Sequence, residues 1–79
     1  MAEEHNSVQL QVADRHNLPL RFAHMTLAGY SDFTNADAVV NCLRLNPEVI
    51  TNDRVFQIVD SRGAVVMDDC KIHEAVRRR

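Results

Sequence analysis

The last thirteen residues, MDDCKIHEAVRRR, hold most of the side chains that could do chemistry together. If this stretch is helical, Cys70 and His73 share a face, as two metal ligands or a nucleophile and its base would require. Two ligands are too few for zinc, because a structural site takes four and a catalytic site takes three plus water. A nucleophile pair also needs an orienting group, an oxyanion hole and a cleft. We therefore expect no metal, no cofactor and no enzymatic activity, and we expect Cys70 to be a small buried side chain.

The same stretch has the pattern of a short capped helix. Asp68 or Asp69 is suited to the N-cap position, and a carboxylate there also complements the helix dipole. Arginines at 77–79 fall in the last turn, where positive charge suits the exposed carbonyls. Three apolar residues at helical spacing could pack on a sheet: Ile72, Ala75 and Val76. Alternatively, a strand continues to Cys70 and a disordered tail follows.

Arg77, Arg78 and Arg79 form the one run of positive charge in the sequence. They could contact phosphate groups or an acidic partner, and Tyr30, on the single-glycine loop LAGYSDF, could contact a protein partner. Nucleic acid is the less favoured ligand, because the net charge is −2, the other arginines are scattered and only 5% of residues are aromatic. We favour a solvent-exposed tail that caps the helix, since charge runs usually face water.

His24 and Asp60 are the remaining candidates for acid–base chemistry. No carboxylate pattern accompanies His24, so we expect a half-buried histidine whose hydrogen bonds are satisfied. Asp60 begins the turn DSRG, where its side chain can accept backbone hydrogen bonds. The sequence has no phosphate-binding loop, dinucleotide fingerprint or nucleophile elbow.

The first thirty residues predict two strands. In SVQLQVAD, Val8, Leu10 and Val12 alternate with glutamines, which is the period of a half-buried strand. Turn-forming residues follow in DRHN, at 14–17. The stretch LPLRFAHMTLAGY, at 18–30, predicts the returning strand; its proline belongs at a strand start or on a sheet edge, because proline has no N–H to donate.

The stretch FTNADAVVNCLRLNP predicts the main helix. Thr34 followed by Asp37 resembles a capping box, with aspartate in place of glutamate. The helix should end at Asn46, because Pro47 disfavours helical geometry in the residue before it. The stripe expected to pack on a sheet is Ala36, Val39, Val40 and Leu43.

Residues 54–67 predict a second hairpin. RVFQIVD is rich in β-branched and aromatic residues, Gly63 in the turn DSRG can take positive φ, and AVVM returns as a strand. The predicted fold is α+β: a four-stranded antiparallel sheet in ββαββ order, one helix packed on a face, and a short C-terminal helix or tail. The strand order is left open. The opposite face must be polar, covered by the terminal segment, or shared with a partner.

Seventy-nine residues suit a single domain, 1–79, with a flexible N-terminus at 1–6 and a flexible basic tail at 77–79. No apolar run approaches the roughly 18 residues that a membrane span needs. The first residues lack a signal-peptide pattern, so we expect a cytoplasmic protein in which Cys42 and Cys70 are free and mostly buried, although a disulfide is an alternative.

We predict from these features a small non-enzymatic protein-binding or regulatory module that is homodimeric and acts through a sheet edge or face. The expected partner is a protein, including a second copy of the chain, and neither nucleic acid nor a membrane. The alternative is a weak nucleic-acid or phosphate binder that uses the C-terminal arginine tail, and it requires salt-dependent binding.

Overall fold

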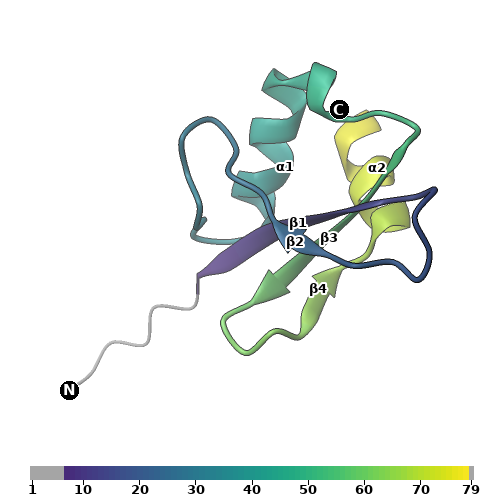
Figure 1. Ribbon diagram of the computed structural model, residues 1–79. Helices are drawn as coiled ribbons and strands as arrows, with labels where there is room; N and C mark the ends of the chain where they lie inside the picture. The colour runs from purple at the N-terminus through teal and green to yellow at the C-terminus, as the bar shows by residue number, and fades with distance from the viewer. Residues whose placement is uncertain (1–6, 79) are drawn as a thin grey trace.

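The computed structural model describes residues 7–78. All four strands join one antiparallel sheet in the order β2-β1-β3-β4, and both helices lie on the same side of it (Figure 1). The predicted α+β fold with ββαββ order is therefore confirmed. In chain order the elements are β1 Val8–Asp14, β2 Ala23–His24, α1 Ala36–Leu45, the 3-10 turn η1 Pro47–Val49, β3 Arg54–Asp60, β4 Val65–Met67 and α2 Asp69–Arg77.

The two seven-residue strands β1 and β3 form the centre of the sheet and pair along their whole length. Directly opposite residues in an antiparallel pair point to the same face, so Leu10 and its partner Ile58 both face the helices. The helices contribute Val39, Leu43 and Ile72 to this core, each of which is fully buried. The C-terminal segment is thus a helix that covers the same face as α1, and it leaves the other face without a helix.

Helix α1 begins one residue later than the sequence suggested. Asn35 is the N-cap, and its side-chain Oδ1 accepts a 2.9 Å hydrogen bond from the backbone N–H of Ala38. The predicted capping box of Thr34 and Asp37 is therefore wrong. The reason lies outside the helix: Phe33 is held extended by two 2.8 Å backbone hydrogen bonds with Val8, so the turn into the helix is delayed. The predicted apolar stripe and the end before Pro47 are confirmed.

The predicted second strand, 18–30, shrinks to two residues, Ala23 and His24. Beyond β2, Met25 donates one further backbone hydrogen bond to Leu10, and the place beside Val8 is then occupied by Phe33. Just after β1, the backbone N–H of Arg15 donates to the carbonyl oxygen of Asp53. This bond continues the pairing of β1 with the β3 side of the sheet and not with β2. β2 is therefore short because Phe33 occupies part of the β1 edge with which the predicted strand 18–30 would pair.

The second hairpin and the terminal helix agree with the predictions. Asp60 Oδ1 accepts the backbone N–H groups of Arg62 and Ala64 at 2.8 and 2.9 Å, and Gly63 has φ of +87°. Asp68 is the N-cap of α2 and accepts the N–H of Lys71 at 2.9 Å. Residues 69–77 are helical, so the alternative in which a strand continues to Cys70 is excluded.

Candidate functional site

Neither α1 nor α2 covers the opposite face of the sheet (Figure 1). The strand register places on it three residues each from β1 and β3 and one each from β2 and β4, eight in all. None of these eight described positions is Asp, Glu, Lys or Arg, although charged residues make up 25% of the chain. The positions are Gln9, Gln11, Ala13, His24, Val55, Gln57, Val59 and Val65.

Glutamine amides dominate the centre of this face. Gln57 Nε2 donates a 2.6 Å hydrogen bond to Gln11 Oε1 across the central strand pair, and Gln9 Nε2 donates to Asp32 at its border at 2.8 Å. Within residues 7–78, Oε1 of Gln57 and Nε2 of Gln11 have no side-chain hydrogen-bond partner. Gln57 therefore keeps its Oε1 acceptor, and Gln11 keeps its Nε2 donors, for an approaching surface to use.

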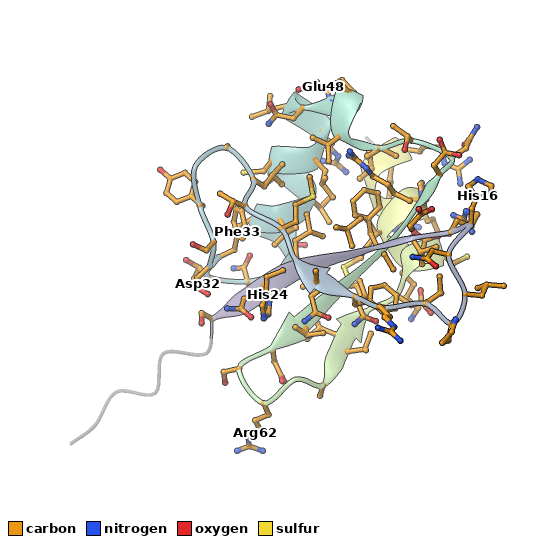
Figure 2. The ribbon with its side chains drawn as sticks, viewed as in Figure 1. His16, His24, Asp32, Phe33, Glu48 and Arg62 are labelled. Carbon is orange, nitrogen blue, oxygen red and sulfur yellow. The ribbon has the colours of Figure 1, made fainter. Side chains whose placement is uncertain are left out.

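Small apolar residues lie between the amides. Ala13 and Val59 are buried but belong to this face and not to the helix-covered core. Val65, at the β4 border, is 53% exposed. His24, labelled in Figure 2, stands on β2 and is exposed, so the prediction of a half-buried histidine is wrong. Its partner across the register is Gln11, on a short edge strand with little to cover it.

The sheet edges offer less backbone than the face. β2 has two residues, and β4 has three with an irregular register opposite Ile58 and Val59. Short edge strands and bulges are the usual protection against pairing with another chain. A surface that acts through this sheet is therefore better placed on the face than on an edge.

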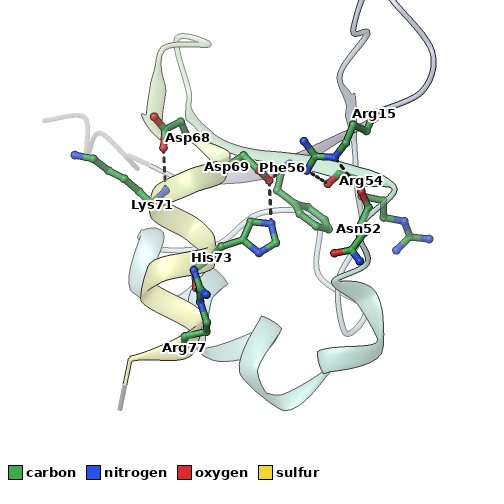
Figure 3. A network of polar contacts seen from close by, with 9 residues as sticks. All are labelled: Arg15, Asn52, Arg54, Phe56, Asp68, Asp69, Lys71, His73 and Arg77. Carbon is green, nitrogen blue, oxygen red and sulfur yellow. Dashed lines mark hydrogen bonds and ion pairs between the residues drawn. The ribbon is translucent and has the colours of Figure 1, made fainter.

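A second polar constellation surrounds Asp69, at the start of α2 (Figure 3). Its Oδ1 accepts the backbone N–H of Phe56 at 2.8 Å and lies 3.2 Å from Nε2 of His73, while Oδ2 lies 3.5 Å from Arg15. Phe56 is the β3 residue just beyond the end of β4, so the carboxylate takes the place of a missing strand neighbour. The Arg15 side chain also donates to the carbonyls of Asn52 and Arg54.

The His73 imidazole packs and pairs within the fold, through contacts with Phe56 and Asp69. Its ring meets the ring of Phe56 edge-on at 6.3 Å between centroids, and its Nε2 is engaged by Asp69. Cys70 is exposed and Cys42 is half-buried, and both are free thiols. The expectation that Cys70 is a buried apolar side chain is therefore wrong, because the face of α2 that it occupies is not the face that carries Ile72.

The predicted contact residues lie far apart. Arg77 is the last residue of α2 and donates from Nε to the carbonyl of His73, Arg78 lies 3.9 Å from Glu74, and Arg79 lies outside the described residues. Tyr30 is 62% exposed and directly follows Ala28 and Gly29, which form a tight turn and both have positive φ. The structure does not bring Tyr30 and the arginines into one site.

Sequence reasoning missed the residues that tie the elements together. Arg44 donates from Nη2 to the carbonyls of Ala75 and Arg78, both at 2.6 Å, and so joins the C-terminal ends of the two helices. The sequence predicts for Asp69 only an N-cap or helix-dipole role, and it marks Arg15 only as one of several scattered arginines. No local pattern marks such residues, because their partners are backbone groups more than thirty positions away for Arg15 and Arg44.

Residues 7–78 contain no group of three or more His, Cys, Asp or Glu side chains placed to hold a metal ion. Within the same part of the chain, neither helix has the length and apolarity that crossing a membrane requires. Comparison of the chain with protein-family models, with curated proteins and with solved structures found no match.

Proposed function

We propose that this chain is a small non-enzymatic protein-binding or regulatory module that forms a homodimer through the uncovered sheet face. The observation that carries the proposal is the absence of Asp, Glu, Lys and Arg from the six solvent-accessible positions of this face, in a chain of which 25% is charged. Depletion of charged residues is the compositional mark of the core of an interface. A face without charge also meets a second copy of itself without like-charge repulsion.

The glutamines suit a symmetric contact. A two-fold axis near Gln11 and Gln57 brings the same amides together from both copies, and an amide both donates and accepts. The free acceptor on Gln57 of one copy then meets the free donor on Gln11 of the other. Val65 adds exposed apolar surface at the border.

The size of the face predicts a weak dimer. Seven-residue strands span roughly 23 Å and four strands span roughly 19 Å, so the projected face is at most about 440 Å² per copy. Two such faces bury about 900 Å², below the roughly 1,200–2,000 Å² of standard stable interfaces. We therefore expect an association that depends on concentration, with a dissociation constant in the micromolar range.

The proposal includes a cytoplasmic location and a regulatory role toward another protein. Two free cysteines, one of them exposed, support a reducing compartment. The dimer test is sedimentation velocity over a range of concentrations up to high micromolar. A monomer throughout that range contradicts the homodimer.

The variant that tests the surface is Gln57→Lys, which places like charges near the two-fold axis and should weaken the dimer by more than about tenfold. Its control, Ser61→Lys, adds the same charge on the exposed β3–β4 turn and should leave association unchanged. For a different protein partner, affinity capture from the native host followed by mass spectrometry compares the wild type with Gln57→Lys. Capture that is identical with both proteins places the partner on another surface.

A further inference from the structure

A groove runs between α1 and α2, on the side of the molecule opposite the uncovered sheet face. Its volume is about 530 Å³, and it is open to solvent. Its apolar lining comes from Val40 of α1, Ala75 of α2 and Met67 at the end of β4. It lies outside the surface used in the proposed function and stands on separate observations.

The two helices that form the groove run roughly parallel. Arg44, near the end of α1, bonds to the carbonyls of Ala75 and Arg78 at the end of α2. Residues from both first turns, Asp37 and Lys71, line the same groove. The Arg44 hydrogen bonds hold the helices at this separation, so the groove is preformed in the free protein.

Cations line the groove at both of its ends. Lys71 lies in the first turn of α2, and Arg78 is the C-cap residue seven positions later, which is roughly 10.5 Å along the helix axis. Arg44 faces them from α1. Three cations and two carboxylates give the groove a charge of +1, whereas the whole chain carries −2.

The carboxylates leave Lys71 and Arg78 largely available, while Arg44 is engaged with the carbonyls of Ala75 and Arg78. Within the described chain, neither Lys71 nor Arg44 has a carboxylate within 4.0 Å, and Arg78 lies 3.9 Å from Glu74 in an exposed pair. Exposed pairs of this kind contribute little and are readily exchanged. A ligand with negative charge at two points can therefore pair with both ends of the groove.

We propose that the groove binds an acidic amphipathic helix of a partner protein. A third helix fits a groove between two parallel helices, because its side chains enter the space between their ridges. The spacing of Lys71 and Arg78 is matched by acidic residues at i and i+7 of the incoming helix. Leucine-sized residues at i+3 and i+4 then face Val40 and Ala75.

The probe is a fluorescein-labelled helical peptide on an alanine-rich background, with Glu at i and i+7 and Leu at i+3 and i+4. Fluorescence anisotropy at low ionic strength should show saturable binding. A matched peptide with Lys in place of both Glu residues should bind at least tenfold more weakly. Equal binding of the two peptides, or no binding of the acidic peptide at millimolar protein, overturns the proposal.

Two double variants distinguish peptide binding in the groove from a general effect of the protein's net charge. Lys71→Glu with Arg78→Glu should weaken binding of the acidic peptide by at least tenfold. Arg21→Glu with Arg62→Glu makes the same change of charge away from the groove and should alter binding by less than about twofold. Equal losses in both double variants overturn the proposal.

A measurement on the unaltered protein covers the case in which a variant fails to fold. Titration of the isotope-labelled wild type with the acidic peptide should shift the amide resonances of Val40, Lys71 and Ala75. Shifts confined to Gln11 and Gln57 place the peptide on the sheet face and overturn the proposal. Because the two sets of residues lie on opposite sides of the sheet, this result also tests the groove independently of the dimer.

Discussion

Asp69 gives the sharpest test of how this small fold is stabilised. Its Oδ1 accepts the Phe56 backbone N–H, a group on a central strand residue with no exposed surface. In Asp69→Ala this donor loses its partner, which costs roughly 1–3 kcal/mol. The His73 contact and the favourable position at the helix N-terminus each add under about 1 kcal/mol. We therefore expect the free energy of unfolding to fall by about 2–4 kcal/mol.

That loss is large for a chain of this size. A domain of 79 residues has a total stability of roughly 4–12 kcal/mol, so Asp69→Ala should leave it marginal. Asp69→Asn keeps an oxygen acceptor for the Phe56 N–H and removes only the charge, so it should cost about 1 kcal/mol. Comparison of the two variants separates the contribution of the hydrogen bond to the free energy of unfolding from that of the charge.

The assay is equilibrium urea unfolding followed by circular dichroism, with the slope of free energy against urea compared between variants. Hydrogen exchange of the Phe56 amide gives a local readout and should quicken in Asp69→Ala more than in Asp69→Asn. Asp68→Ala is the matched control, since it removes the helix cap without touching Phe56. A change below about 0.5 kcal/mol in Asp69→Ala, or equal losses in Asp69→Asn, would refute the reasoning.

Three further outcomes follow from single contacts. Ala28→Gly should raise the free energy of unfolding by about 0.5–1 kcal/mol in a thermal melt, because alanine is strained at φ of +54° and glycine is not. Arg44→Ala should lower stability by about 0.5–1.5 kcal/mol and should quicken amide exchange in the last turn of α2 while leaving β3 unchanged. Exposed Cys70 should react with a thiol reagent faster than half-buried Cys42, so a Cys70→Ser variant should lack the fast phase.

The sequence predicts best where local and tertiary preferences agree. Asp60 and Gly63 specify the β3–β4 turn by chemistry that acts over four residues, and the structure uses both as expected. The end of α1 before Pro47 is equally local. Both features are local: Asp60 acts through hydrogen bonds of its own side chain, and Gly63 and Pro47 act through the backbone conformations that they allow or disfavour.

Prediction fails where two segments compete for one partner. The residues at 18–30 have the alternation of a strand, but only one edge of β1 is free to pair with them. Along that edge, β1 pairs successively with Ala23, Met25 and Phe33. The same Phe33 contact moves the N-cap of α1 from Thr34 to Asn35. A sheet face was predicted as a binding surface, but its residues could not be identified from the sequence, because the uncharged positions become one surface only when β1 and β3 are known to be neighbours.

The two proposed surfaces lie on opposite sides of the sheet, so a dimer formed through the face carries its two grooves on the outside. A partner with two acidic helices on a linker of suitable length then binds both, and the second contact forms at a high effective concentration. A tandem acidic peptide should bind the wild type more tightly than a single one, and it should lose this advantage in Gln57→Lys. The single peptide should bind both proteins equally, because the groove does not depend on Gln57. If the tandem peptide keeps its advantage in Gln57→Lys at protein concentrations where that variant is monomeric, the gain does not come from a face-to-face dimer.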